Sequence, residues 1–311
     1  MFAAKNEAKV FYRPYGYSAF LRWVHGFSQS DTALVTVQFL LTSFDSLFLY
    51  FTVDYLLGFG SKGIRILVLL LFSPLVLVVC NVVSSDGLFA SLTVLWFALL
   101  LWIILRRPWW AVVVQLVLLY CLFLIRYNAI YFPVVAALAF VFAYGASLPY
   151  RIVGVASSIL VVMSGYISVK KETYEATGAN VFSGFSGWQS ANNALFMYKH
   201  IKVDSRIFDE PELRVLDTIV KTYIDSVSAE TLQKIEEGKL ASSIFMWDSK
   251  SPLKVYTAYY CNKNRLSYYP AWRQVSELFS EYSKELILQY PMAYFRYFMW
   301  NNMVYFFVPD K

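Results

Sequence analysis

Long stretches without any charged residue dominate the first half of the chain and constrain its fold more than any other feature. Long charge-free runs dominate up to about Ser168, whereas Lys, Glu, Asp and Asn become frequent after Lys170. The 311 residues are 58% hydrophobic and only 15% charged, which is too apolar for a soluble domain of this size. The pattern therefore predicts an integral membrane protein whose two halves face different solvents.

The apolar runs predict an α-helical bundle, because a helix needs roughly 20 apolar residues to cross a bilayer core of about 30 Å. Turn residues such as Gly58, Pro108 and Pro149 separate the runs. In the polar half, apolar spacing predicts helices at 209–227 and 271–289. We place an outer juxtamembrane segment at 1–31, a bundle of about six transmembrane helices at 32–169 (32–57, 64–83, 87–106, 109–125, 128–147 and 151–169), and a mainly helical extracytoplasmic domain at 170–311.

The loop cations predict how the bundle is oriented, because Lys and Arg accumulate in cytoplasmic loops. We assign the loops at Asp86 and Arg126, and everything after Lys170, to the outside. This orientation leaves the basic segment before Ser30 outside with no preceding helix, so we expect either a spanning helix upstream of Met1 or a helix count that differs by one from ours. The loops assigned to the cytoplasm carry Lys62, Arg65, Arg106, Arg107 and Arg151.

Several classes of function are not supported. The net charge is +6, but the basic residues form no stripe, so we expect no nucleic-acid partner. The sequence has no Walker lysine loop, no GxGxxG after a strand and no HExxH, so we expect no nucleotide cofactor. His25 and His200 are isolated and no CxxC pair occurs, which argues against a histidine or cysteine metal site.

The strongest candidate for chemistry is Asp86, between two apolar runs on the predicted outer side. A carboxylate at this depth could bind a divalent metal ion, take a proton or meet a lipid headgroup. The alternative is a helix N-cap, for which Ser84-Ser85-Asp86 is well suited. Arg126 and Asn128 occupy the other outer loop, where the guanidinium could bind a lipid phosphate or act as an interfacial anchor. Because alternate loops of an antiparallel bundle share a face, we expect Asp86 and Arg126 to approach one another.

Two further segments and one buried charge are candidates. Arg13 lies in a Tyr-rich turn that predicts an interfacial segment facing headgroups. Trp188, Gln189 and Asn192 could offer a stacking face and amides to a sugar, or could belong to a capped helix that packs on the bundle. Asp45 lies near the middle of the first run, where a carboxylate is either functional or bonded within the bundle.

The order of these features resembles the polytopic C-type (GT-C) glycosyltransferases of bacterial envelopes, in particular the protein-mannosyltransferase and lipid A aminoarabinose-transferase relatives. Ser85-Asp86-Gly87-Leu88-Phe89 resembles the second acidic motif of that family, and Arg13-Pro14-Tyr15-Gly16-Tyr17 resembles the stretch ahead of its second helix. The segment from Gly187 to Asn193 is similar to one found in such proteins. The family's first acidic motif has no match, since Glu7 is the only carboxylate in the equivalent region.

The resemblance implies transfer of a sugar from a polyprenyl-phosphate donor to an envelope acceptor at the outer face of a bacterial inner membrane. Asp86 would be the catalytic or metal-binding residue and Arg126 would contact the donor phosphate. The substrate-binding residues would be Arg13, Arg126, Asn128, Trp188, Gln189 and Asn192. Because the first acidic motif is missing, we expect the chain to need an upstream helix and acidic loop for activity. The alternatives are a lipid-linked glycan transporter or flippase, and a noncatalytic envelope assembly protein.

Overall fold

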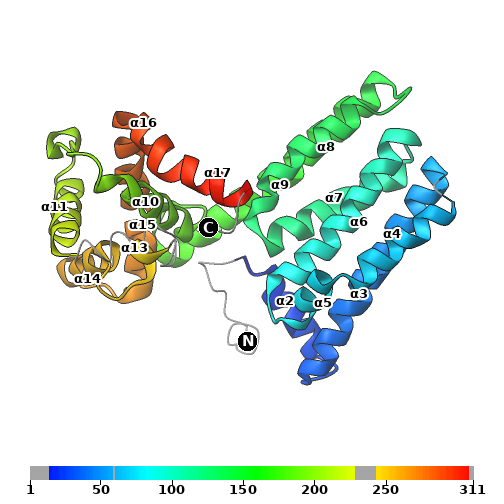
Figure 1. Cartoon of the computed structure of the whole chain (residues 1–311), viewed down its shortest axis with the longest axis horizontal. Coiled ribbons are helices and arrows are strands. Elements are labelled where there is room, and N and C mark those ends of the chain that lie inside the picture. Colours follow the sequence, from blue (N-terminus) through cyan, green and yellow to red (C-terminus); the bar gives the residue numbers. More distant parts are fainter. Residues whose placement is uncertain (1–13, 59, 228–242, 308–311) are drawn as a thin grey trace. The chain divides into compact units, whose positions relative to one another are not determined.

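The computed structural model of the chain describes residues 14–58, 60–227 and 243–307. The regular structure within these ranges is helical, and none of their residues forms a strand. By its internal contacts the chain divides into two compact units, unit 1 (Met1–Ser168) and unit 2 (Val169–Lys311), which are described separately (Figure 1). The sequence predicted a boundary at 169–170.

Unit 1 holds the apolar helices. Four stretches of the described residues are long and apolar enough to cross a membrane: Asp31–Leu57, Gly63–Asn81, Ser85–Leu105 and Leu148–Glu175. Two apolar helices, Trp109–Ile125 and Tyr127–Val141, are shorter, so a bundle of about six complete spans stays a prediction. The helices are α2 (Gly16–His25), α3 (Asp31–Leu57), α4 (Ser61–Phe72), α5 (Pro74–Asn81), α6 (Ser85–Leu105), α7 (Trp109–Ile125), the 3₁₀ turn η1 (Tyr127–Tyr131), α8 (Phe132–Val141) and α9 (Leu148–Thr177).

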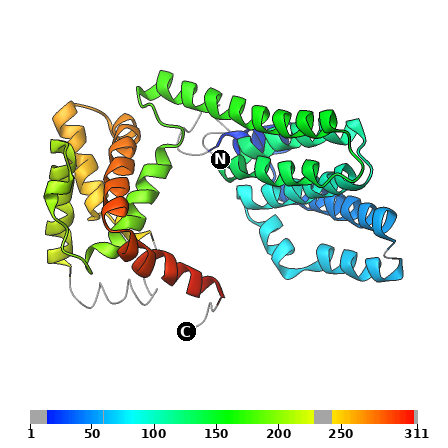
Figure 2. The same cartoon turned by 90° about the horizontal axis from the view of Figure 1, so that it is seen from above.

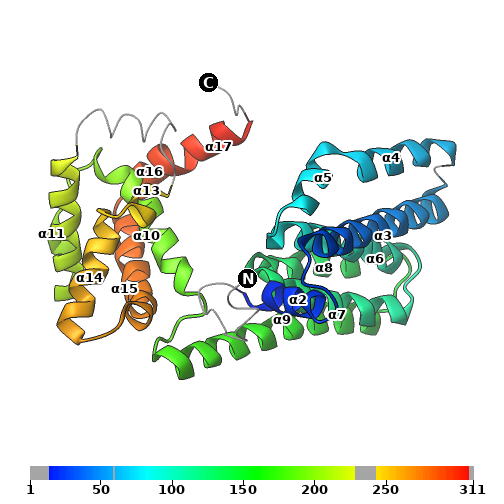
Figure 3. The same ribbon diagram turned by 90° about the horizontal axis from the view of Figure 1, so that it is seen from below.

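Three of the predicted helices differ from the observed ones. The run at 64–83 is broken at Ser73, because Pro74 has no backbone N–H to continue the helix, and α5 begins there in a new direction (Figure 3). The run at 128–147 ends at Val141, and Gly145 in the following loop has a φ of 64°, which a helix does not allow. The helix predicted at 151–169 is observed as the longer α9, which extends from Leu148 to Thr177 and so continues into the polar half.

Helices α3, α6 and α7 run side by side in unit 1, and α4 and α5 lie along α3 (Figure 2). Buried polar side chains join three of the helices. Gln115 of α7 accepts a hydrogen bond from the Trp96 indole of α6 (3.1 Å) and donates one to the Ser158 hydroxyl of α9 (3.1 Å). Hydrogen bonds of this kind hold apolar helices together where lipid gives no hydrophobic driving force between them.

Unit 2 is built around the pair α10 (Gly184–Tyr198) and α15 (Tyr268–Gln289), with α11 (Pro211–Ser226) and α14 (Pro252–Asn264) beside α15. Helices α11 and α15 confirm the predictions at 209–227 and 271–289. Gly187 permits the close approach of α10 to α15, because a Cβ there would clash with the carbonyl oxygen of Ser276. The remaining elements are η2 (Ser205–Ile207), α13 (Ile244–Trp247), α16 (Pro291–Tyr294), the π-helical segment η3 (Phe295–Met299) and α17 (Trp300–Phe307).

Candidate functional site

Asp86 and Arg126 meet in unit 1, as the sequence predicted. The guanidinium Nη1 of Arg126 donates a hydrogen bond to Oδ1 of Asp86 and forms an ion pair with it. The alternative interpretation of Asp86 as the N-cap is wrong, because the cap is Ser84, whose hydroxyl accepts the backbone N–H of Asp86 (3.2 Å). Asp86 lies in the first turn of α6, where the helix dipole favours a carboxylate and its side chain is free to reach across to Arg126.

Arg126 ends α7 and turns the chain into η1. Its backbone is extended (φ −147°, ψ 127°), and its guanidinium lies 5.8 Å from the ring centroid of Phe89, one turn after Asp86 on α6. The side chains of Arg126 and Asp86 are 36% and 56% exposed, so a ligand can reach both. Asn128 follows in η1 and is exposed. The arrangement offers further guanidinium donors and a carboxylate oxygen to a phosphate-bearing ligand.

Helix α2 packs at the same end of unit 1. Gly16 lies against the end of α7, where a Cβ would come within 2.6 Å of the Leu124 carbonyl oxygen. The Tyr17 hydroxyl donates to Gln38 of α3 (3.2 Å), whose amide in turn donates to the Cys80 carbonyl of α5 (2.7 Å). Burial raises the pKa of Tyr17 to about 12, so the phenol stays neutral at physiological pH. These contacts join α2 to α7 and to α3, and α3 to α5. Arg13 lies outside the described residues.

The residues near Asp86 do not fit a metal ion held by protein ligands. Among the residues that the structure describes, no group of three or more His, Cys, Asp or Glu side chains could hold one. Divalent cations such as Ca²⁺ and Mg²⁺ take about six oxygen ligands, of which Asp86 supplies at most two. A divalent cation at Asp86 would therefore have to take most of its ligands from water or from the phosphate of a bound substrate.

Trp188 is a core residue of unit 2, and its observed position does not match a sugar-stacking platform. It is fully buried, its indole N–H donates to the Trp272 carbonyl oxygen (3.0 Å), and its ring stacks on Trp272 with centroids 5.5 Å apart. Asn192 is 2% exposed, whereas Gln189 is exposed. The capped-helix alternative describes this segment, since the Ser183 hydroxyl accepts the N–H of Phe185 (3.3 Å) at the start of α10. The helix packs on α15 within unit 2.

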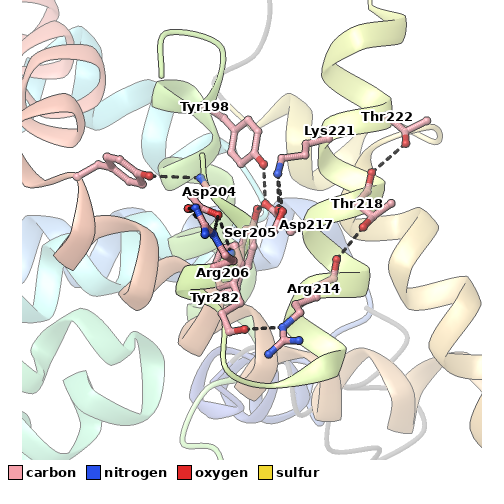
Figure 4. Close-up of polar contacts among 12 residues, drawn as sticks. Tyr198, Asp204, Ser205, Arg206, Arg214, Asp217, Thr218, Lys221, Thr222 and Tyr282 are labelled. Atoms are coloured by element: carbon pink, nitrogen blue, oxygen red, sulfur yellow. Dashed lines mark hydrogen bonds and ion pairs between the residues drawn. The ribbon is translucent and has the colours of Figure 1, made fainter. Parts of the chain in front are cut away.

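Asp217 is a buried carboxylate of unit 2 with several side-chain partners, and the sequence analysis missed it. It is fully buried and accepts hydrogen bonds from the hydroxyls of Tyr198 (2.5 Å), Tyr282 (3.0 Å) and Ser205 (2.7 Å) (Figure 4). The Lys221 ammonium lies 3.0 Å from Oδ2. Burial, assisted by the nearby carboxylate, raises the pKa of Tyr198. Because its oxygens are saturated by protein donors, Asp217 organises the fold of unit 2 rather than a ligand site.

Asp45 is 1% exposed in the middle of α3, with Oδ2 accepting a hydrogen bond from Ser91 of α6. Its Oδ1 is buried and has no hydrogen-bond partner among the described residues. The sequence analysis expected Asp45 to be either functional or bonded within the bundle, and the bond from Ser91 is of the second kind. The second oxygen leaves a polar group without compensation in an apolar region.

Comparison of the chain with protein-family models, curated proteins and solved structures finds no match. The architecture defines the class: a helical protein with several helices able to cross a membrane, joined to a second helical unit.

Proposed function

We propose that the chain is a membrane glycosyltransferase of the C type that takes its sugar from a polyprenyl-phosphate donor and delivers it to an envelope acceptor. The observation that carries the proposal is the solvent-accessible Asp86–Arg126 pair at the end of apolar helices. A guanidinium fork matches the oxygens of a phosphate, and apolar helices are compatible with a polyprenyl chain in the surrounding lipid.

Arg126 has the principal role in this proposal. Asp86 takes one guanidinium donor and thereby holds the group in place, which leaves other N–H groups for the donor phosphate. In an inverting attack, the acceptor oxygen bonds to the anomeric carbon and loses its proton, while the bond to the phosphate breaks and its electron pair leaves with the phosphate. Arg126 would stabilise the charge that develops on that leaving group. Asp86 would position the arginine, and the proton released by the acceptor would pass to water.

A transporter of lipid-linked glycans is the second candidate, and Asp45 favours it. An ionisable residue deep in a membrane helix often lies on the path of a substrate or proton, and one oxygen of Asp45 has no partner among the described residues. In that case Asp45→Asn would abolish movement of the lipid-linked sugar across proteoliposomes but leave donor binding at Arg126 intact.

The full chain in detergent can be tested for binding of a polyprenyl-phosphate sugar. We expect Arg126→Gln to weaken binding roughly 10- to 100-fold, because a hydrogen bond to a charged group contributes about 1.5–3 kcal/mol. Arg65→Gln is the matched control, since Arg65 is exposed on α4 and its loss should change binding less than about twofold. Equal binding by the wild type and Arg126→Gln would refute the phosphate site. Binding without any sugar transfer would leave the site but refute the enzyme.

A further inference from the structure

A second cationic site lies at the opposite end of α6. Arg107 follows the C-terminus of this helix, and Arg151 lies in the first turn of α9. Helix α6 contains 21 residues, and at about 1.5 Å per residue it separates Arg107 from Asp86 by about 30 Å, the thickness of a bilayer core. This end is therefore distinct from the Asp86–Arg126 pair.

The loop between α8 and α9 accepts hydrogen bonds from both arginine side chains. Nη1 of Arg107 donates to the carbonyl oxygen of Gly145, and Nη2 of Arg151 donates to that of Ala143 (3.2 Å). The backbone N–H of Tyr144 donates to the Ile104 carbonyl oxygen (2.9 Å), which ties the loop to the end of α6. Two guanidinium groups are thus fixed on acceptors only two residues apart. Within the described ranges no Asp or Glu forms an ion pair with either of them.

The backbone of Arg107 has an uncommon conformation. Its φ of 59° lies in the left-handed region, which is uncommon for residues other than glycine and costs roughly 1–2 kcal/mol. Gly145 also has a positive φ, of 64°. At Arg107 this conformation ends α6, and the backbone N–H of Arg107 donates to the Trp102 carbonyl oxygen (2.9 Å). Here it accompanies the bond from Arg107 to the Gly145 carbonyl, which keeps the guanidinium on the loop.

The surroundings suit a lipid rather than a free anion. Tyr144 and Trp109 beside the arginines are 81% and 57% exposed, as aromatic side chains are at a membrane interface. Arg106 lies 5.4 Å from the ring centroid of Tyr55, and this ring stacks on Trp102 (5.4 Å). Both rings belong to an open groove of about 440 Å³, large enough to accept part of an acyl chain, which is lined by Phe48, Phe51, Thr52, Asp54, Tyr55 and Trp102.

We propose that Arg107 and Arg151 bind the phosphate of an anionic phospholipid headgroup, with an acyl chain of that lipid in the neighbouring aromatic groove. The two guanidinium groups each use a donor on the loop and keep others for phosphate oxygens. Basic pockets between membrane helices recognise anionic headgroups on the cytoplasmic side, which is the side that the loop charges predict for this end. The site is independent of the proposed sugar transfer.

Native mass spectrometry of the full chain in detergent tests the proposal, with phosphatidylglycerol and phosphatidylcholine as probes. The wild type should prefer phosphatidylglycerol. Since each basic residue at an anionic surface changes affinity about fivefold, Arg151→Gln should lower the preference about fivefold and the double variant Arg107→Gln/Arg151→Gln roughly 30-fold. The single variant keeps the Arg107 bond to the loop and serves if the double variant does not fold.

The control Arg65→Gln removes one exposed arginine from the same predicted side and should alter the preference less than twofold. Phe51→Gln, in the groove, should weaken both lipids alike, because Phe51 is 61% exposed and contributes apolar surface rather than charge. An equal loss with Arg65→Gln would overturn the proposal in favour of a general charge effect. Displacement of phosphatidylglycerol by millimolar inorganic phosphate would assign the arginines to a free anion and would also overturn the lipid site.

Discussion

Replacing Asp217 by alanine should loosen the whole of unit 2. The carboxylate is fully buried, and it is the common acceptor for Tyr198, Tyr282 and Ser205 and the ionic partner of Lys221. The alanine variant leaves these donors in place and removes their acceptor. Tyr282 is completely buried, so its hydroxyl cannot turn to water.

The size of the effect follows from which donors are left without an acceptor. A buried polar group without a partner costs about 1–3 kcal/mol, so the two phenols together cost about 2–6 kcal/mol. Lys221 contributes less, because its side chain is 38% exposed and its ammonium can be hydrated. We therefore expect a loss of about 4 kcal/mol in the stability of unit 2.

Hydrogen exchange of the full chain, followed by mass spectrometry, measures this loss locally. Where exchange is limited by opening, about 4 kcal/mol corresponds to roughly 1,000-fold faster exchange in α10, α11 and α15. Asp225→Ala is the matched control, because Asp225 is exposed on the same helix and its loss should change stability by less than about 0.5 kcal/mol. Similar exchange rates in the Asp217 and Asp225 variants would show that the buried carboxylate does not hold the unit together.

Three further outcomes are expected. Burial raises the pKa of Tyr282 above the ordinary 10.0, so the folded state holds this proton more tightly than the unfolded state; unit 2 should be stable below pH 10 and lose stability above it, and Tyr282→Phe should lessen that loss in alkaline unfolding followed by tyrosinate absorbance. Gly187→Ala should destabilise unit 2 by about 1–3 kcal/mol in denaturant unfolding, because its methyl group meets the Ser276 carbonyl; an unchanged midpoint would contradict the close packing. Single cysteines at Asp86 and Arg106, in a chain without native cysteines, should label from opposite sides of the membrane; labelling from one side would contradict a spanning α6.

The sequence predicted best what depends on local chemistry. Long apolar runs produced helices close to the expected positions, because in such runs the helix satisfies every backbone group internally. The meeting of Asp86 and Arg126 was also predictable, since alternate loops of an antiparallel bundle lie at one end. Ser84 took the capping role, although Ser84-Ser85-Asp86 offered more than one candidate for it.

Tertiary packing explains what the sequence analysis missed. Trp188, Asn192 and Leu195 are spaced as one face of a helix, which indicates a buried stripe as readily as a sugar site. Asp217 lies next to Leu216 on the apolar face of α11, and that position was the available signal. Its donors come from Tyr198 and Tyr282 on other helices, so their identity depends on contacts that no local pattern contains.

Gln115 has a consequence for how unit 1 assembles. Helix α7 is apolar on nearly every side, so hydrophobicity alone gives it no preferred rotation about its own axis among lipid chains. The single amide of Gln115 meets Trp96 on one neighbour and Ser158 on another, and a turn of the helix in either direction would break both bonds. One side chain of α7 therefore fixes the rotation of this helix relative to α6 and α9. A redesigned α7 would have to keep Gln115 to preserve this packing, even if every apolar residue around it were replaced.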